Sequence, residues 1–317
     1  MEYDYRGWWI KNANEYLSNF RAGAICVEYS KEDAKKIYKE LPHLITASDI
    51  DQYAYALFLM NLNISKNDSY KALQIAQNLI NKGNVLGNYL SAHLIFDGIV
   101  VKNVDAIAVK HLQKVLQYIP NFAPALYNLG CCYYYGKGIE KNPSLGMKYI
   151  EKANDLGFNK AVNYIARCYY DGNNNYPVNY QKALELFKQT YLRGNAEAHY
   201  YLGEMHRYGK GLSQDLNKAL PYYSIAGYKG HIEAAYLAGV LQFGGKHVPL
   251  NIPEAANLLK IAAQGRKTEA MYVLALIYIV HENFNHKKDE GIEWLKKACK
   301  LGYEDAIKLA NKMNIRY

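Results

Sequence analysis

The sequence predicts an all-α protein in which helix-turn-helix hairpins of about 36 residues stack side by side. Two independent series of small residues repeat along the 317-residue chain. The first series has spacings of 36, 37, 36, 36 and 36 residues and consists of Ala125, Ala161, Ala198, Ala234, Ala270 and Ala306. The second has spacings between 36 and 38 residues and consists of Ala72, Ala108, Gly146, Ala183, Ala219, Ala255 and Gly291. Two series that advance together are typical of stacked supersecondary units.

The first half of each unit predicts a helix, helix A. Counted from the opening alanine, small or apolar residues stand at offsets zero, four, five, eight and eleven, as in Ala198, Leu202, Gly203, His206 and Gly209. These offsets fall on one face of a helix with 3.6 residues per turn. A Gly-Lys-Gly run then predicts the end of helix A, because glycine adopts left-handed backbone angles without steric cost. The run occurs at residues 136–138 and 209–211.

The second half of each unit predicts another helix, helix B, with a capping residue at its start and a glycine at its end. An Asp or Asn stands four residues before the small residue of the second series, and such side chains cap helix starts by accepting a backbone N–H. These residues are Asp68, Asn142, Asn179, Asp215 and Asn251. A glycine eleven residues after the small residue predicts the end of helix B. These glycines are Gly83, Gly157, Gly194, Gly230 and Gly302.

These residues together resemble a known repeat. The run A-x-Y-x-L-G, then GKG, then a capped K-A that opens a helix ending in glycine, is similar to the Sel1-like repeat, a relative of the tetratricopeptide repeat. The resemblance implies a right-handed α-solenoid. Two copies depart from the pattern. Residues 161–197 have Ala166 in place of glycine and a long Asn-rich turn, and residues 270–305 have His281 in place of the loop glycine, so we expect different turns there.

The chain divides into three predicted regions. Residues 1–50 form an N-terminal capping hairpin, in which Trp8 and Trp9 fold back on the first helices. Residues 51–305 hold about seven Sel1-like repeats, at 51–86, 87–124, 125–160, 161–197, 198–233, 234–269 and 270–305. Residues 306–317 form a C-terminal capping helix, and Lys308, Lys312 and Arg316 give it the polar outer side that a terminal unit needs.

The sequence contains no pattern typical of catalysis. The nine histidines form no HExxH pair, and His199 and His206 are seven residues apart. The run from His281 to His286 lies in a turn and has no second group of ligands to complete a metal site. We therefore expect a non-enzymatic protein without a metal ion or cofactor.

The N-terminus predicts no secretory signal, since acidic residues stand where a signal peptide has basic ones. No apolar stretch approaches 18 residues, so we expect no membrane insertion. The five cysteines form no spaced pairs within a hairpin. We interpret them as small buried thiols of a cytoplasmic protein, and a disulfide between Cys132 and Cys168 is the alternative.

A surface strip on helix A is the candidate binding site. Offsets two, six and nine lie together beside the buried face, and stacking aligns them across the array. By analogy with tetratricopeptide arrays, this strip is expected to form the concave surface. The candidate protein-binding residues are Tyr89, Phe96, Tyr127, Tyr134, Arg167, Tyr170, Tyr200, Arg207, Tyr236 and Phe243.

The strip has two interpretations. Tyrosine at offset two belongs to the pattern of the family, so these side chains either pack between hairpins or bind a partner. At offset nine the pattern requires no aromatic residue, yet Tyr134, Tyr170 and Phe243 flank Arg207. Tyrosine and arginine are enriched at interface hot spots, which favours a partner-binding groove at offset nine.

The charge favours an acidic partner segment. The net charge is +9, and residues 126–317 carry 25 basic against 17 acidic groups, whereas residues 1–125 carry 13 against 12. Such asymmetry acts mainly on the rate of encounter. Nucleic acid is not expected, because the lysines are mixed with glutamates on helix B and no nucleic-acid motif is present.

We therefore predict a non-catalytic scaffold or adaptor that binds a protein partner along the concave helix-A surface. Two alternatives remain open: an immunity or inhibitor protein that neutralises a cognate toxin or enzyme, and a regulatory subunit of an enzyme complex. The bias toward Asn, Lys, Ile and Tyr is typical of an AT-rich genome and favours a bacterial origin. The sequence indicates neither the partner nor the oligomeric state.

Overall fold

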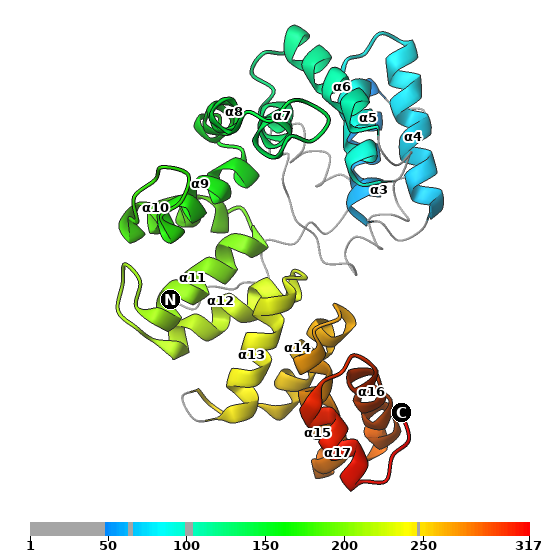
Figure 1. Cartoon of the computed structure of the whole chain (residues 1–317), viewed down its shortest axis with the longest axis vertical. Coiled ribbons are helices and arrows are strands. Elements are labelled where there is room, and N and C mark those ends of the chain that lie inside the picture. The colour runs from blue at the N-terminus through cyan, green and yellow to red at the C-terminus, as the bar shows by residue number, and fades with distance from the viewer. Residues whose placement is uncertain (1–47, 63–65, 99–103, 246–247) are drawn as a thin grey trace. The chain divides into compact units, whose positions relative to one another are not determined.

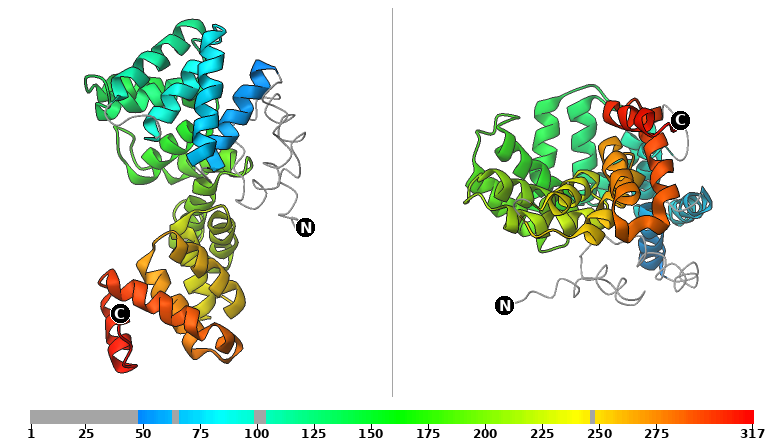
Figure 2. Two further views of the ribbon diagram at one scale, coloured as in Figure 1. Left: turned by 90° about the vertical axis from the view of Figure 1, so that its right-hand side faces the viewer. Right: turned by 90° about the horizontal axis from the view of Figure 1, so that it is seen from below.

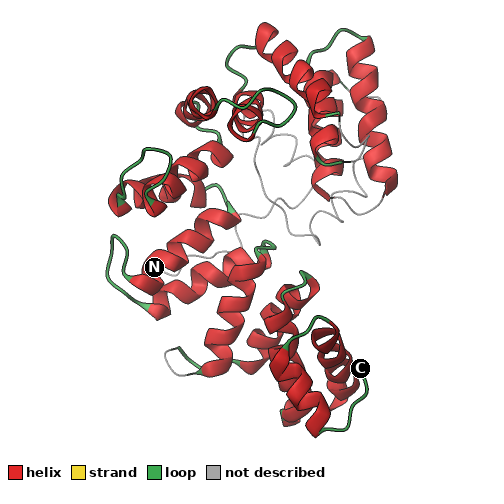
Figure 3. Cartoon of the chain, viewed as in Figure 1, coloured by secondary structure: helices red, strands yellow, loops and turns green. Residues whose placement is uncertain are grey.

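All regular structure in the described residues is helical. The structure is a computed structural model, and it describes residues 48–62, 66–98, 104–245 and 248–317. Within these ranges it contains fifteen α-helices and one 3-10 helix, and no strand (Figures 1 and 3). The all-α helical-repeat class predicted from the sequence is confirmed. The predicted N-terminal capping hairpin, including Trp8 and Trp9, lies outside the described residues.

The chain divides into two compact units, Met1–Asp171 and Gly172–Tyr317. In the first unit each helix packs mainly against its neighbours in sequence, and α3 also contacts α5. Its helices are α3 (Asp49–Leu62), α4 (Lys66–Asn81), α5 (Leu86–Phe96), α6 (Asp105–Tyr118), α7 (Ala123–Tyr135), α8 (Pro143–Asp155) and α9 (Asn159–Asp171).

The second unit continues the succession of hairpins to the C-terminal end of the chain (Figure 2). Each helix contacts the next from α10 onward, as expected of a one-dimensional repeat array. The odd-numbered helices correspond to the predicted helix A and the even-numbered ones to helix B. The elements are α10 (Tyr180–Tyr191), α11 (Ala196–Tyr208), α12 (Leu216–Tyr228), α13 (Ile232–Gly244), α14 (Ile252–Gln264), α15 (Thr268–Val280), the 3-10 helix η3 (Glu282–Lys287), α16 (Lys288–Lys300) and α17 (Glu304–Lys312).

Local signals determine where the hairpins turn. Helices α7 and α11 end at Gly136 and Gly209, which have left-handed φ angles of 73° and 68°. Four predicted caps are confirmed, because each side chain accepts a hydrogen bond from the backbone N–H three residues later. The donor-acceptor distances are 3.0 Å for Asn142, 2.9 Å for Asn179, 3.1 Å for Asp215 and 3.2 Å for Asn251.

The predicted cap at Asp68 is wrong. Helix α4 begins at Lys66, so Asp68 lies inside its first turn, and only 2% of the residue is exposed. The helix therefore starts three residues earlier than the small-residue register indicates. An acidic side chain in the first turn still interacts favourably with the helix dipole.

Both hairpins that depart from the repeat pattern have different turns, as expected. In the turn before α10, Asn174 and Asn175 take the left-handed conformation that glycine has elsewhere, with φ angles of 55° and 65°. Helix α15 ends at His281, whose φ is −85°, and η3 follows directly. Phe284 of η3 is buried and its ring centroid lies 5.4 Å from that of Tyr278, so an aromatic contact supports the turn that lacks a glycine.

Close contacts between helices define the core. In the second unit Tyr223 of α12 is fully buried, and a Cβ atom on Gly203 of α11 would lie only 2.6 Å from its ring. The C-terminal helix α17 buries Ala306 and Ala310 and exposes Lys308 and Lys312, the polar outer side expected of the last helix.

Two global properties complete the fold. Among the described helices, none combines the length and the apolar character needed to cross a membrane. The described cysteines are Cys131, Cys132, Cys168 and Cys299, and none of these four forms a disulfide. Burial raises the pKa of the Cys132 thiol to about 12, so this side chain is a protonated, unreactive core residue at neutral pH.

Candidate binding surface

The clearest candidate surface is the helix-A strip of the second unit, which we define as offsets two, six and nine of α11, α13 and α15. All nine of these residues are half-buried, whereas offsets zero, four and five of the same helices are fully buried. Each helix therefore has a packed face and an adjoining face that solvent reaches. The strip consists of Tyr200, Glu204 and Arg207 on α11, Tyr236, Val240 and Phe243 on α13, and Tyr272, Leu276 and Ile279 on α15.

The offset-two tyrosines of the strip contact the following hairpin. The ring of Tyr200 stacks on the imidazole of His231, with centroids 4.3 Å apart. The ammonium of Lys267 lies 5.0 Å from the ring centroid of Tyr236. Tyr272 packs against Tyr303 at 5.3 Å. In each case the partner is the residue immediately before the next odd-numbered helix, and we call these partners clasp residues.

The same contact occurs in the first unit. Tyr89 lies 5.2 Å from Phe122 and Tyr127 lies 5.6 Å from Phe158, measured between ring centroids. The offset-two tyrosines therefore pack between hairpins, and only part of each ring is left for another molecule. Our sequence reasoning missed the clasp residues, although their spacing was visible. Phe122, Phe158, His231, Lys267 and Tyr303 each stand three residues before an opening alanine.

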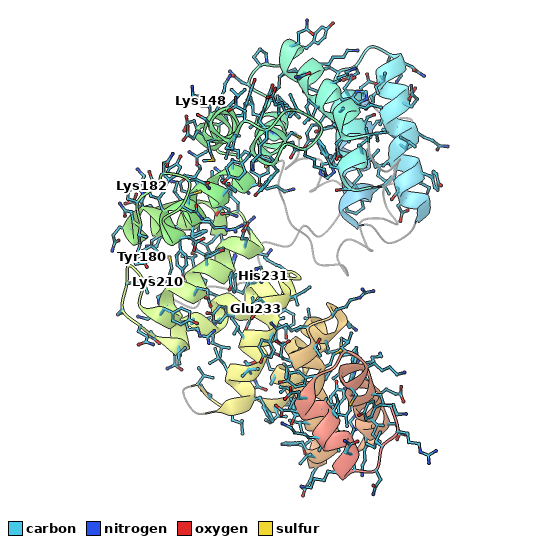
Figure 4. All side chains as sticks on the ribbon, viewed as in Figure 1. Lys148, Tyr180, Lys182, Lys210, His231 and Glu233 are labelled. Atoms are coloured by element: carbon cyan, nitrogen blue, oxygen red, sulfur yellow. The ribbon has the colours of Figure 1, made fainter. Side chains whose placement is uncertain are left out.

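Lys267 also forms ion pairs with carboxylates of two hairpins. Its Nζ atom lies 2.8 Å from Glu233 at the start of α13 and 3.6 Å from Glu269 at the start of α15. The hydrogen bond to Glu233 raises the pKa of Lys267, which therefore stays charged at neutral pH. Figure 4 shows Glu233 and His231 together at the start of α13. This end of the strip thus holds one cation between two carboxylates.

At offsets six and nine, α11 supplies a polar group of three residues. The buried hydroxyl of Tyr223 donates a hydrogen bond of 2.5 Å to Oε1 of Glu204, and a guanidinium nitrogen of Arg207 lies 3.8 Å from the same oxygen. Burial, followed by the bond to Glu204, raises the pKa of Tyr223 well above its ordinary value, so the hydroxyl stays protonated. Glu204 is held in place by α12, and Arg207 keeps a side-chain exposure of 34%.

The other two helices have no charge at these offsets. Helix α13 presents Val240 and Phe243, and α15 presents Leu276 and Ile279, all half-buried. Val280, at the end of α15, is 71% exposed and adjoins this apolar part. The strip therefore changes from polar on α11 to apolar on α13 and α15.

Comparison with known proteins identifies the family of this chain. The Sel1 repeat model matches residues 123–158, 159–195, 196–231, 232–266 and 268–303, which is more than half of the chain. The protein belongs to the Sel1 repeat family. The matched Sel1 repeats start at or close to the first residues of α7, α9, α11, α13 and α15. The helices α3 to α6 lie before the matched repeats and still form hairpins.

Two solved structures with TM-scores above 0.5 share the fold. A Sel1 repeat protein from Oxalobacter formigenes is 25% identical, with a TM-score of 0.58, and the match covers 77% of this chain and 96% of that one. A protective antigen of uropathogenic Escherichia coli is 18% identical, with a TM-score of 0.55, and the match covers 93% of this chain and 63% of that one. The second likeness shows the fold alone. An immunity protein from Pseudomonas aeruginosa is 18% identical over 70% of this chain and 82% of its own, with a TM-score of 0.49.

The remaining site residues predicted from the sequence lie on the first unit of this Sel1 protein. Phe96 lies under the ammonium of Lys137 at 4.8 Å, and Tyr134 packs edge-on against Tyr164 at 6.3 Å. Arg167 is exposed. Tyr89 and Tyr170 are each only 6% exposed, so these two side chains offer almost no surface to a partner.

The described part of this Sel1 chain brings no three His, Cys, Asp or Glu side chains close enough to hold a metal ion. His206 is half-buried, and its ring stacks on Tyr222 with centroids 5.6 Å apart. Burial lowers the pKa of His206, as expected for a packed imidazole. What the described surface can do chemically is recognise another molecule through aromatic, apolar and ionic contacts.

Proposed function

We propose that this protein is a non-catalytic scaffold or adaptor that binds a protein partner through the helix-A strip of the second unit. The observation that carries the proposal is the contrast between the two faces of α11, α13 and α15. Offsets zero, four and five are buried, while offsets two, six and nine remain half-buried on three successive helices. Such a repeated, partly solvated face is the surface on which repeat arrays bind their partners.

The side chains of the strip support this role. Interface centres are rich in aromatic residues, methionine and arginine and poor in other charged groups. The strip contains three tyrosines, Phe243 and Arg207, and helices α13 and α15 carry no charge at offsets six and nine. The positive net charge of the second part of the chain further supports a partner with an acidic segment. We further propose a cytoplasmic location, which the free, buried thiols of Cys132 and Cys299 support, because disulfides are rare in a reducing compartment.

The experiment introduces Arg207→Glu in the full chain. Tagged wild-type and variant chains are incubated with extract from cells that carry the gene, and bound proteins are quantified by mass spectrometry. We expect the helical circular dichroism signal and the Tm to change little, because Arg207 lies on the partly solvated face of α11. Capture of the main partner should fall at least about tenfold.

The matched control is Lys182→Glu, which makes the same change of charge at an exposed position of α10 (Figure 4). This control should capture the partner as well as the wild type does. Equal loss in both variants would indicate a general charge effect, and unchanged capture by the arginine variant would contradict the proposed strip. The identity of the partner then separates an adaptor from an inhibitor: a captured toxin or enzyme that loses activity when the protein is added indicates inhibition.

A further inference from the structure

The clasp at the start of α13 differs from the other clasps in its chemistry. Of the five clasp residues, His231 alone has a side chain that ordinarily changes its charge between pH 5 and 8. It lies beside Glu233 at the N-terminal end of α13 (Figure 4), and its ring stacks on Tyr200 of the helix-A strip. A change of charge on this imidazole therefore acts directly on a contact between two hairpins.

The hydrogen bond at the His231 ring determines its protonation state. The Nδ1 atom lies 3.2 Å from the backbone nitrogen of Ala234, and a backbone N–H can only donate. Nδ1 is therefore an unprotonated acceptor, and the ring is neutral with its proton on Nε2. Protonation turns Nδ1 into a donor, so α13 loses its N-terminal cap. It also places a positive charge beside the positive end of the helix dipole.

The charged groups around His231 do not compensate for an added proton. Burial lowers the pKa of His231, and Glu233 of α13 opposes this shift. The carboxylate of Glu233, however, lies 2.8 Å from Nζ of Lys267 at the start of α15. From α11 the ring meets the phenol of Tyr200, whose pKa is raised by burial, so it stays neutral. Lys229, at the end of α12 and two residues before His231, carries a charge of the same sign as an imidazolium.

The next clasp shows what a cation needs at this place. The ammonium of Lys267 lies 5.0 Å from the ring centroid of Tyr236, with Glu233 at 2.8 Å and Glu269 at 3.6 Å. The side chain of Lys267 makes no cap bond to α15. A protonated His231 would have to share Glu233 with Lys267 and would lose a cap bond that Lys267 never makes. A cation is therefore favoured at the Lys267 clasp and disfavoured at the His231 clasp.

We infer that His231 is a pH-sensitive clasp: the neutral imidazole caps α13 and supports Tyr200, and protonation releases both contacts. The folded chain binds this proton less readily than the unfolded chain. The stabilisation is therefore present above the unfolded histidine pKa of about 6.5 and is lost as the pH falls toward the folded value. Because Tyr200 belongs to the helix-A strip, the release weakens binding of a partner there. Only this last step rests on the proposed function.

The test of the clasp is an NMR titration of the full chain, isotope-labelled at its histidines and alanines, between pH 7.5 and 5. The His231 signal is assigned as the one missing from His231→Phe. It should titrate at a lower pH than the signal of His286, which is exposed. Once His231 is protonated, the Ala234 amide should exchange with solvent about tenfold faster relative to its intrinsic rate.

A second variant and two outcomes make this test decisive. His231→Asn keeps a side-chain oxygen that can cap α13 and has no titrating ring, so its Ala234 amide should stay protected at both pH values. The inference is wrong if His231 titrates at or above the pH of His286. It is also wrong if the Ala234 amide of the wild type keeps its protection through the titration.

The effect on the strip is measured with the partner captured in the Arg207→Glu experiment. Capture by the wild type should fall at least about fivefold from pH 7.5 to 5. It should fall much less in His231→Phe, which keeps an aromatic clasp like Phe122 and cannot titrate. The matched control, His286→Phe, should behave as the wild type does. Equal decreases in the wild type and His231→Phe would show that the clasp does not regulate the strip. A failure of Arg207→Glu to reduce capture would contradict the strip and leave the NMR result unaffected.

Discussion

Tyr200 and His231 lie face to face, with ring centroids 4.3 Å apart and ring planes inclined by 16°. The Nδ1 atom of the same imidazole accepts the backbone N–H of Ala234 at 3.2 Å. One side chain therefore caps helix α13 and also supports the tyrosine of the preceding hairpin. Lys267 and Tyr303 occupy the equivalent place in the next two hairpins. The ammonium of Lys267 contacts Tyr236 and the ring of Tyr303 contacts Tyr272, so the clasp residue differs in chemistry while its position is kept.

This contact predicts a measurable coupling between the two residues. Tyr200→Ala and His231→Ala, alone and combined, should give a coupling energy of about 0.5–1.5 kcal/mol, the usual range for an aromatic pair. In this double-mutant cycle, the free energy lost with the α13 cap cancels, because both variants that lack His231 lose the cap. Urea unfolding followed by circular dichroism measures the four stabilities.

The control cycle pairs Tyr200→Ala with Lys267→Ala. Lys267 contacts Tyr236 and lies one hairpin away, so these two changes should add within about 0.5 kcal/mol. If the coupling of Tyr200 with His231 is no larger than in this control pair, the stack does not join the hairpins.

Gly203 tests the packing of α11 on α12. A Cβ atom at this position would lie 2.6 Å from the ring of Tyr223, which is fully buried and cannot move aside freely. Gly203→Leu should therefore lower the free energy of unfolding by about 1–3 kcal/mol through overpacking. Gly244→Leu is the control, because nothing lies within 4 Å of a Cβ there, and its stability should stay within about 0.5 kcal/mol of the wild type. Equal losses in the two variants would show that the contact with Tyr223 is not the cause.

The hairpin period could be predicted from the sequence because its signals are local. Gly209 ends α11 through its own backbone angle, and Asn179 starts α10 through a bond to the third residue after it. Such signals depend only on neighbouring residues. Asp68 shows their limit: the same residue type in the same register lies within the first turn of α4, because the helix extends further back than the signal indicates.

The exposure of the strip could not be predicted in the same way. Tyr170 and Arg207 share offset nine, yet Tyr170 is 6% exposed and the side chain of Arg207 is 34% exposed. The difference comes from packing within each unit, which no period reveals. Likewise, helical spacing placed Glu204 on the strip, but its bond to Tyr223 depends on how α12 packs against α11.

The cap at Asn179 should carry a measurable part of the stability of its hairpin. Its side chain accepts the backbone N–H of Lys182 at 2.9 Å, and this bond satisfies one of the free donors at the start of α10. Asn179→Ala should cost about 0.5–2 kcal/mol in chemical unfolding. Asn179→Asp keeps an acceptor oxygen and should stay close to the wild type. If both substitutions cost the same, the hydrogen bond is not what stabilises the helix start.

The buried imidazole of His199 should make stability depend on pH. Only 5% of the residue is exposed, its Nδ1–H donates to the carbonyl of Asn195 at 2.6 Å, and the rings of Tyr191 and Tyr222 pack against it. Burial is the main cause that lowers the pKa of His199 to about 4. The unfolded chain, with a histidine pKa near 6.5, therefore binds a proton more readily than the folded chain.

Stability from this residue is complete above about pH 6.5 and decreases as the pH falls toward 4. At pH 5 the loss should be about 2 kcal/mol, since each pKa unit corresponds to about 1.4 kcal/mol. His199→Phe removes the titrating group, and the Asn195 carbonyl still accepts the backbone N–H of residue 199 at 3.2 Å. Urea unfolding at pH 7.5, 6 and 5 should therefore give a smaller decrease for His199→Phe than for the wild type. Parallel pH profiles for the wild type and His199→Phe would show that this imidazole is not the buried group that titrates.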